Sequence, residues 1–324
     1  MHANLFNQNA SKKDVFLHNL RSNNGRYKRY IKAPLRYGGG KSLAVGLIVE
    51  YIPNGVRRII SPFIGGGSVE IACATELGLE VLGFDIFDIL VNFYQVLLKD
   101  KQALYNNLLS LEPTQETYNI IKQELKAHYK KECVLDPLIL ARDYYFNFNL
   151  SYGPGFLGWM SKIYTDKQRY LNALLKIKDF NAPSLKVECS SFEEVLLAYP
   201  NDFFYLDPPY VLENSKMFKG IYPMRNFPIH HNGFKHEVLA HMLKRHKGPF
   251  ILSYNDCEFV RNAYKDFKIL EPSWQYMGQG EIRMGKNRLE RGDNNHVNQS
   301  HELLIIKEQK CILAKSKLPL KSLM

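Results

Sequence analysis

Residues 57–85 read RRIISPFIGGGSVEIACATELGLEVLGFD, and this stretch decides the fold class. An apolar run at residues 57–64 is typical of a buried strand and leads into a glycine turn at residues 65–68. Helical character follows over residues 69–77, and residues 81–84 form a second short apolar strand. A strand, a helix and a strand in this order begin a parallel sheet, whose ligands bind at the carboxyl ends of the strands.

The rest of the chain divides into a helical segment and a return to strands. Residues 88–180 carry long helical patterns, including 89–99 and 118–129, with no clear strand run. Strand signals resume at 185–188, 203–206, 250–253 and 303–306. We therefore expect a doubly wound α/β fold, with its core at residues 31–87 and 181–308 and a helical insertion at residues 88–180.

Positive charge is concentrated at the two ends of the chain. The net charge is +11, of which residues 1–41 carry +8 and residues 307–324 carry +4. Residues 1–30 are predicted to be a basic, polar and weakly ordered arm, and residues 309–324 a basic tail. Two interpretations stay open for these ends, namely contact with nucleic-acid phosphates and simple solvation.

Composition argues against membrane and metal-binding classes. No apolar run approaches a membrane span, and the polar start lacks the apolar core of a secretion signal, so we expect a cytoplasmic protein. The five cysteines show no pair at metal-ligand spacing, and we expect no metal site; they are Cys73, Cys133, Cys189, Cys257 and Cys311.

Asp207-Pro208-Pro209-Tyr210 follows the strand-like run at residues 203–206. Prolines donate no backbone hydrogen bond, and each favours extended geometry in the residue before it. The Asp207 carboxylate and the Pro208 carbonyl would then form an acceptor pair for an amino group. Tyr210 would offer a flat face to an aromatic ring held there. These three residues are the predicted catalytic group, and the alternative is a proline-stopped strand with a surface aspartate.

Two glycine-rich segments suggest ligand contacts. The segment after the first strand does not complete the dinucleotide-binding fingerprint, because Glu70 occupies the position of its third glycine or alanine. Binding of a pyrophosphate is therefore disfavoured, whereas binding of a nucleoside with a small charged tail remains compatible with the sequence. Asp85 ends the next strand, where an acid can accept hydrogen bonds from a ribose diol. Residues 38–42 are no phosphate loop, because Leu35 replaces the required glycine. They form instead a mobile turn that carries Tyr37 and Lys41 toward a carboxylate.

Residues 144–160 combine rings, amides and glycines at unusual density. Part of this stretch must be core. Four of its side chains nevertheless suit contact with nucleic-acid bases, and we predict them to bind DNA together with Lys162: Asn147, Asn149, Ser151 and Tyr152. Arg283 and Arg288, in the polar stretch 281–300, are further DNA-binding candidates, although a solvated loop is the simpler interpretation there.

In this order the motifs resemble the Dam-like, D12-class DNA adenine-N6 methyltransferases of the alpha group, which use S-adenosylmethionine. The matching motifs are Arg36-Tyr37-Gly38-Gly39-Gly40-Lys41, Pro62-Phe63-Ile64-Gly65-Gly66-Gly67-Ser68, Asp85, Ser191-Phe192, Asp207-Pro208-Pro209-Tyr210 and Ser253-Tyr254-Asn255-Asp256. In this family Ser61 would usually be an acid and Tyr37 a tryptophan, and residues 147–159 follow the family pattern only loosely.

The resemblance implies a sheet of about seven strands and a role for the helical insertion as a DNA target-recognition domain. It assigns cofactor contacts to Tyr37, Lys41, Phe63, Gly65, Gly67, Ser68, Asp85, Ser191, Phe192 and Asp207. Asp85 would hold the ribose hydroxyls, Ser191 and Phe192 would border the adenine, and Asp207 would touch both cofactor and substrate.

The expected function is site-specific methylation of the N6 amine of a flipped adenine in double-stranded DNA. Cytosine-N4 methylation and a catalytically impaired DNA-binding protein are the alternatives, and an ATP-driven enzyme is the weakest. A cognate restriction endonuclease is a candidate partner.

Overall fold

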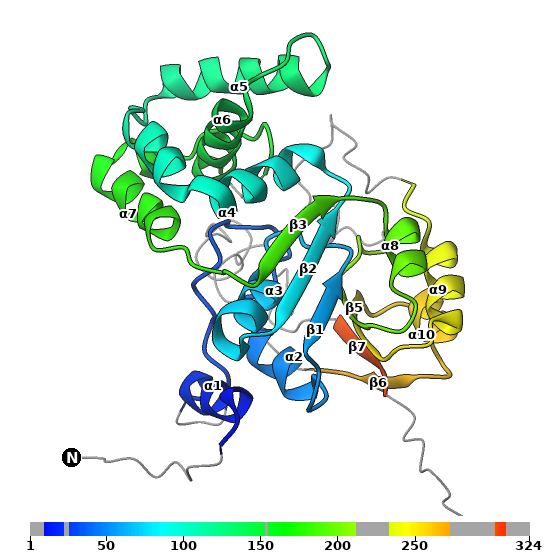
Figure 1. The fold of residues 1–324 in the computed structure, drawn as a ribbon. Coiled ribbons are helices and arrows are strands. Elements are labelled where there is room, and N and C mark those ends of the chain that lie inside the picture. The colour runs from blue at the N-terminus through cyan, green and yellow to red at the C-terminus, as the bar shows by residue number, and fades with distance from the viewer. Residues whose placement is uncertain (1–9, 23–25, 153–154, 212–232, 273–301, 309–324) are drawn as a thin grey trace, which may run out of the picture.

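A seven-stranded sheet forms the centre of the computed structural model, which describes residues 10–22, 26–152, 155–211, 233–272 and 302–308 (Figure 1). In chain order the strands are β1 (Arg58–Ser61), β2 (Glu80–Asp85), β3 (Leu185–Cys189), β4 (Phe203–Leu206), β5 (Phe250–Asn255), β6 (Lys268–Leu270) and β7 (Glu302–Lys307). Their spatial order is β3-β2-β1-β4-β5-β7-β6. Strands β1 to β5 pair in parallel, and β7 runs antiparallel to both β5 and β6.

The chain reverses its winding direction at β1. This strand pairs with β2 on one side and with β4 on the other, where Ile59 faces Phe203 and Ile60 faces Phe204. The carboxyl ends of β1 and β4 therefore emerge side by side at one edge of the sheet. Open α/β sheets bind ligands at such a switch point, where neighbouring loops diverge.

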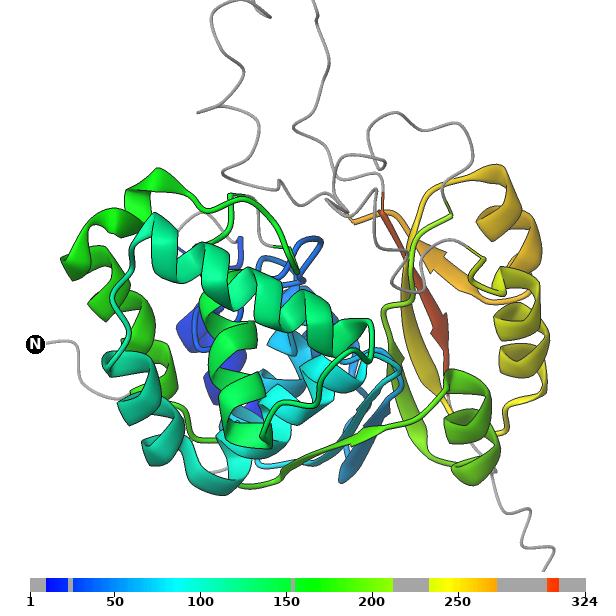
Figure 2. The same cartoon turned by 90° about the horizontal axis from the view of Figure 1, so that it is seen from above.

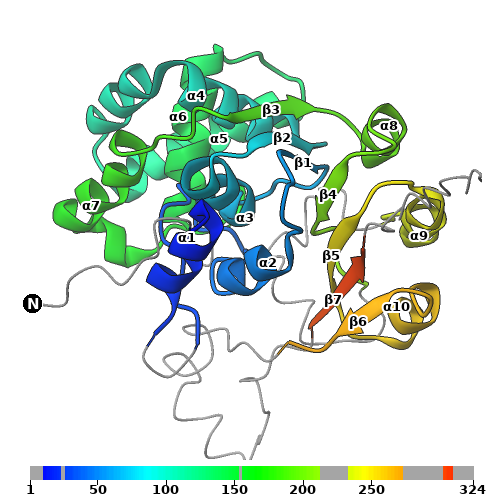
Figure 3. The same ribbon diagram turned by 60° about the horizontal axis from the view of Figure 1, so that its bottom comes forward.

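Helices cover both faces of the sheet, which confirms the expected doubly wound α/β class. Figure 3 shows α2 (Val45–Tyr51) and α3 (Ser68–Ala72) on one face and α8 (Phe192–Ala198), α9 (His236–Arg245) and α10 (Glu258–Ala263) on the other. Side chains of successive strand residues enter opposite layers, so Ile59 packs in one hydrophobic cluster and Ile60 in the other. A strand buried on both faces explains the unbroken apolar runs in the sequence.

The segment between β2 and β3 is helical in the structure. It contains α4 (Asp88–Leu109), α5 (Gln115–Tyr129), α6 (Pro137–Leu150), the short helix η2 (Lys162–Thr165) and α7 (Lys167–Lys178). Seen from above, these helices gather on one side of the sheet, opposite α8 to α10 (Figure 2). Helix α4 kinks at Asp100, whose carboxylate accepts a hydrogen bond from the backbone N–H of Ala103 at 2.9 Å and so caps the second half. No helix in the described ranges is long and apolar enough to cross a membrane.

Part of the N-terminal arm is ordered, contrary to expectation. Residues Lys12–Leu20 form α1, which begins with a capping box between Ser11 and Asp14. Its one buried side chain, Phe16, contacts the ring of Tyr30 at 6.1 Å between centroids. The prediction of weak order is wrong for this segment because an apolar anchor and a cap offset its polar composition. Residues 309–324 lie outside the described ranges.

We predict that Leu252→Ala in β5 lowers the free energy of unfolding by about 2–5 kcal/mol, because it leaves a cavity in the central sheet. Leu252 is fully buried, whereas Leu197 on α8 is 74% exposed, which makes Leu197→Ala a matched control. Urea denaturation of both variants measures the difference. Equal losses would contradict the described packing.

Candidate active site

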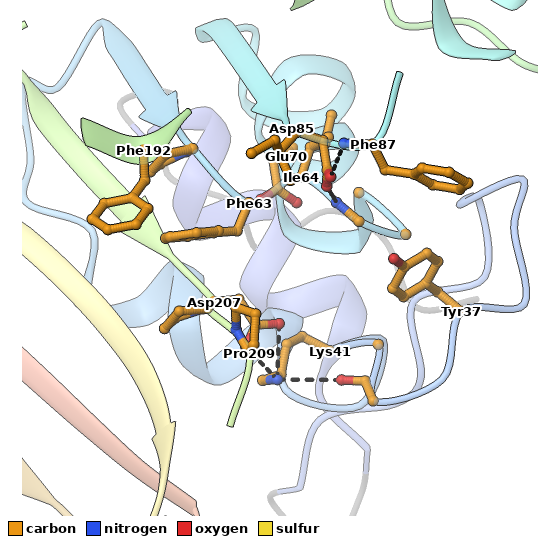
Figure 4. A pocket seen from close by; sticks show the side chains of 18 of the residues that line it. Tyr37, Lys41, Phe63, Ile64, Glu70, Asp85, Phe87, Phe192, Asp207 and Pro209 are labelled. Carbon is orange, nitrogen blue, oxygen red and sulfur yellow. Dashed lines mark hydrogen bonds and ion pairs between the residues drawn. The ribbon is translucent and has the colours of Figure 1, made fainter. Parts of the chain in front are cut away.

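A cavity of about 290 Å³ opens where the carboxyl ends of β1, β2 and β4 meet (Figure 4). Segments that are distant in sequence line it, including residues 37–41, 62–70 and 207–210. The cavity brings together all but one of the predicted catalytic and cofactor-binding residues: Tyr37, Lys41, Phe63, Gly65, Gly67, Ser68, Asp85, Phe192, Asp207, Pro208 and Tyr210.

The glycine turn after β1 permits close backbone approach. Gly65 and Gly67 adopt left-handed φ values of 46° and 65°, and Gly67 forms the N-cap of α3. A Cβ atom at Gly66 would collide with the side chain of Tyr37. The hydroxyl of Tyr94 on α4 donates a hydrogen bond to the Gly65 carbonyl at 3.1 Å. The turn is thus fixed from both sides and presents backbone atoms to the cavity.

Asp85 ends β2 with its carboxylate held in a defined orientation. Its two oxygens accept hydrogen bonds from the backbone N–H groups of Gly65 at 3.1 Å and Phe87 at 3.0 Å. Each carboxylate oxygen can accept more than one hydrogen bond. The arrangement therefore suits further bonds from a pair of hydroxyl groups on a ligand.

Aromatic side chains form the wall beyond Asp85. The rings of Phe63 and Phe192 lie 5.7 Å apart between centroids, and Phe234 lies 5.2 Å from Phe192. Ile86 also lines this part of the cavity. Neither Phe234 nor Ile86 was predicted, although Ile86 directly follows Asp85 in sequence. A flat apolar ligand ring fits such a wall.

Ser191 has a structural task that the prediction missed. Its hydroxyl accepts a hydrogen bond from the backbone N–H of Glu194 at 3.3 Å and completes a capping box at the start of α8. The cavity is lined by Ser190 and Phe192 instead. The cap holds the Ser191 side chain at the helix terminus, and the cofactor contact of Ser191 stays a prediction.

Lys41 ties the first glycine loop to Asp207 at the end of β4. The Lys41 ammonium donates hydrogen bonds to the two carboxylate oxygens of Asp207 at 2.7 and 2.9 Å. Burial raises the pKa of Asp207 to about 6, although Lys41 pulls it down. The sequence prediction that this lysine would meet a carboxylate agrees with this geometry.

A second acid completes the hydrogen-bond network around Tyr210. The Tyr210 hydroxyl accepts a hydrogen bond from Lys41 at 2.8 Å and donates one to the carboxylate of Glu302 on β7. The Lys41 nitrogen lies 5.0 Å from the centre of the Tyr210 ring, which is buried. Glu302 was not predicted, because only the antiparallel return of β7 brings it here.

Asn255, at the end of β5, fixes the chain just after Tyr210. Its side-chain amide donates a hydrogen bond to the Val211 carbonyl at 3.1 Å, and its side-chain oxygen accepts one from the Val211 N–H at 2.9 Å. This two-point clamp holds the segment 207–211 in place against β5.

Helix α6 holds the loop that carries Tyr37 and Lys41. The Asn149 side-chain oxygen accepts a hydrogen bond from the backbone N–H of Arg36 at 2.9 Å, and the Arg36 guanidinium donates one to the Asn149 carbonyl at 2.9 Å. The Tyr37 ring stacks on Phe148 at 5.4 Å between centroids. The helical segment therefore positions one wall of the cavity.

This geometry corrects three predicted DNA contacts. Asn147, Asn149 and Ser151 are buried, because the first two lie on α6 and Ser151 forms its C-cap. The Asn147 side-chain oxygen accepts a hydrogen bond from the Leu157 N–H, and the Ser151 hydroxyl accepts one from the Gly155 N–H. These groups of Asn147 and Ser151 stabilise the loop that follows α6.

The other DNA-binding candidates are either exposed or lie outside the described residues. Tyr152 is 59% exposed, and Lys162 is also exposed. Trp159, which was not predicted, is 81% exposed. The centre of its ring lies 4.6 Å from the Lys122 ammonium nitrogen. Arg283 and Arg288 lie outside the described residues. Among the residues that the structure describes, no three His, Cys, Asp or Glu side chains gather as metal ligands do.

Residues 37–277 match the family described as D12 class N6 adenine-specific DNA methyltransferase. This range includes every residue that lines the cavity, whereas Glu302 lies beyond it. The chain belongs to this family. Membership of this methyltransferase family implies that the methyl donor is S-adenosylmethionine.

Two curated relatives extend the likeness of this D12-class chain. It is 28% identical to the type II methyltransferase M.FokI of Planomicrobium okeanokoites over 62% of its own length and 33% of that protein. It is 24% identical to the modification methylase StsI of Streptococcus sanguinis over 85% of its own length and 41% of that protein. The D12-class chain thus spans less than half the length of each relative.

The cavity of this D12-class protein fits S-adenosylmethionine in its donor set. The glycine turn allows close approach, Asp85 suits the ribose hydroxyls, and the ring of Phe192 suits the adenine. Lys41 and Asp207 offer charged partners for the methionine end.

Lys41→Met is expected to destabilise the folded protein by about 2–3 kcal/mol at pH 8, because it removes the cation beside a buried carboxylate. Without Lys41 the pKa of Asp207 rises further, so Asp207 binds a proton in the folded state as the pH falls. The destabilisation should therefore shrink between pH 8 and pH 5.

Denaturant unfolding of the variant at both pH values measures this effect. Lys32→Met serves as the control, because Lys32 pairs with Glu76 at the surface at 2.6 Å and should cost less than about 1 kcal/mol at either pH. A loss that does not depend on pH would contradict the role of Lys41 as the counter-ion of Asp207.

Proposed function

We propose that the protein transfers a methyl group from S-adenosylmethionine to the N6 amine of an adenine in a specific sequence of double-stranded DNA. One observation carries this proposal. The acceptor group Asp207 lines the same cavity as Asp85 and Phe192, which suit a nucleoside. Methyl donor and acceptor amine can therefore meet within one enclosure.

The proposed chemistry answers a specific difficulty. The lone pair of an aromatic amine is delocalised into its ring, so the amine is a poor nucleophile until it is held and oriented. The Asp207 carboxylate and the Pro208 carbonyl accept hydrogen bonds from the two amine hydrogens, and Tyr210 contacts the base. When bound, S-adenosylmethionine supplies an electrophilic methyl group on its sulfonium. Orientation and electrostatic stabilisation by these groups then lower the barrier.

Asp207 also accepts the proton that the methylated amine must lose. The amine nitrogen that gains a methyl group must lose one proton to become neutral. Asp207, with its pKa raised to about 6 by burial, is a better proton acceptor than an ordinary aspartate. Lys41 keeps this carboxylate ionised before the reaction through its hydrogen bonds.

The base has to leave the duplex to reach the cavity, at a cost of roughly a few kcal/mol. We assign DNA recognition to the helical segment 88–180, between core segments 31–87 and 181–308. Its exposed Tyr152 and Lys162 support this assignment, since one offers a ring and the other a cation for a phosphate. The names of the relatives, a type II methyltransferase and a modification methylase, make a cognate restriction endonuclease the proposed partner.

Asp207→Asn is expected to lower the rate of DNA methylation at least about 100-fold, because an amide neither accepts the proton nor matches the charge of the carboxylate. Asp202→Asn is the matched control, since Asp202 lies before β4 at the opposite edge of the sheet and pairs with Arg58.

The measurement is digestion of the treated DNA and identification of the modified nucleoside by mass spectrometry. Formation of N6-methyladenine supports the proposal, and formation of N4-methylcytosine would assign the alternative substrate. Full activity of a folded Asp207→Asn variant would overturn the mechanism.

The turnover number at saturating S-adenosylmethionine and DNA is expected to fall as the pH drops below about 6. Asp207 has a raised pKa of about 6 and must be ionised to accept the amine hydrogen, so activity is lost when it binds a proton. A pH profile of kcat between pH 5 and 9 measures this limb. A rate that stays constant down to pH 5 would contradict the assignment.

A further inference from the structure

Glu70 is a buried acid that the proposed mechanism does not use. It lies on α3, where its neighbours Val69 and Ile71 pack in the core, and its side chain is only 3% exposed. It also lines the cavity, and Figure 4 shows its carboxylate there together with Asp85 and Asp207.

The protein gives this carboxylate little compensation. Its described hydrogen-bond partner from another residue is the hydroxyl of Ser61, at the end of β1, which donates to one oxygen at 2.6 Å. Among the described ion pairs none includes Glu70, since Lys41 pairs with Asp207 and Glu302. The backbone N–H of Glu70 also donates to its carboxylate, so both described hydrogen-bond donors are neutral, and a buried carboxylate with no ion pair is costly. Such a cost is retained where a ligand supplies the missing cation.

We propose that Glu70 binds the α-ammonium group at the amino-acid end of S-adenosylmethionine and so selects the complete cofactor over smaller nucleosides. This inference rests on the proposed function, because it assigns a residue to one end of the same ligand. Asp85 and Phe192 suit the nucleoside end of the cavity, and Asp207 marks the acceptor amine. Glu70, Lys41 and Asp207 line the same cavity (Figure 4).

The electrostatic surroundings agree with a cationic ligand. Burial, with a smaller contribution from Asp207, raises the pKa of Glu70 to about 7, whereas the Ser61 hydrogen bond and Lys41 act to lower it. The other titratable groups that face Glu70 are neutral in the usual pH range, because burial raises the pKa values of their hydroxyl or thiol groups; they are Tyr94, Tyr205 and Cys73. Without ligand the site therefore holds more acid than base, and an ammonium group would restore the balance.

The first test compares the binding of two ligands by isothermal titration calorimetry at pH 8. S-adenosylhomocysteine carries the ammonium group, whereas 5′-methylthioadenosine lacks the whole amino-acid end. Glu70→Gln should weaken binding of S-adenosylhomocysteine about 10- to 100-fold, as expected for the loss of a charge-assisted hydrogen bond, and change binding of methylthioadenosine less than about threefold.

Matched controls separate this effect from general damage. Glu76→Gln makes the same substitution on the continuation of this helix, where Glu76 pairs with Lys32 outside the cavity, and should leave both affinities unchanged. S-adenosyl-3-thiopropylamine keeps the amine but lacks the carboxylate, so Glu70→Gln should weaken its binding as well. Unchanged binding of that amine would overturn the assignment to the ammonium group.

Stability of the ligand-free protein gives a readout that does not depend on ligand. The pKa of Glu70 is higher in the folded than in the unfolded state, so its ionisation destabilises the folded protein progressively as the pH rises from the ordinary value of 4.5 through about 7. Glu70→Gln removes this cost and should raise the melting temperature at pH 8 by roughly 2–4 °C, with a smaller gain at pH 5. A purely structural carboxylate predicts the opposite, a lower melting temperature at pH 8.

A relocated carboxylate provides the rescue. Because the Ser61 hydroxyl lies 2.6 Å from the Glu70 carboxylate, S61D in the Glu70→Gln background would place an acid at nearly the same point. This double variant should recover at least tenfold of the lost affinity for S-adenosylhomocysteine.

The outcomes distinguish this inference from the proposed function. If the wild-type protein does not bind S-adenosylhomocysteine, the proposed function fails and this inference with it. If the wild-type protein and Glu70→Gln bind it equally, only the role of Glu70 is overturned. Weakened binding of both S-adenosylhomocysteine and methylthioadenosine to the same extent would also overturn that role.

Discussion

The parallel pairing of β1 with β4 is the constraint on which the site depends. It places the glycine turn after β1 and Asp207 after β4 at one edge of the sheet, although they are far apart in sequence. Lys41 can reach Asp207 only because of this pairing, and the hydrogen bonds between them then fix the loop before α2. Asn255 on β5, the next strand in the sheet, holds the segment after Asp207 through its hydrogen bond to Val211.

The cavity maintains an electrostatic imbalance at a cost to stability. Asp207 and Glu70 line the cavity, and Lys41 pairs with Asp207 and with Glu302 behind it. The pKa values of Asp207 and Glu70 are raised to about 6 and about 7, which means that burial disfavours their charged forms. A fold optimised only for stability would replace such groups with apolar ones.

Sequence alone predicted the parts of the structure that depend on local patterns. The run at residues 203–206 coincides with β4, and the motifs at Gly65, Asp85 and Asp207 line the cavity as expected. Short or half-buried strands such as β6 have too few apolar residues in sequence to be predicted. The antiparallel direction of β7 has no local sequence signature.

Polar residues were the least predictable part of the site. Asn147 and Ser151 look like surface groups in sequence, yet the structure uses them inside the helical segment, where hydrogen bonds offset their burial. Glu70 and Glu302 acquire their roles only from partners that folding brings close. A lone acid within the apolar run of α3 was the available sequence signal for Glu70.

The contacts of α6 with the first glycine loop link two tasks that could have been independent. Asn149 and Phe148 hold Arg36 and Tyr37 from within the segment assigned to DNA recognition. Any DNA-induced shift of α6 would then alter the affinity for the cofactor, and by thermodynamic reciprocity the bound cofactor would alter the affinity for DNA to the same degree. If the helical segment reads the target sequence as proposed, substitutions in α6 that change the target would also change methyl-donor binding.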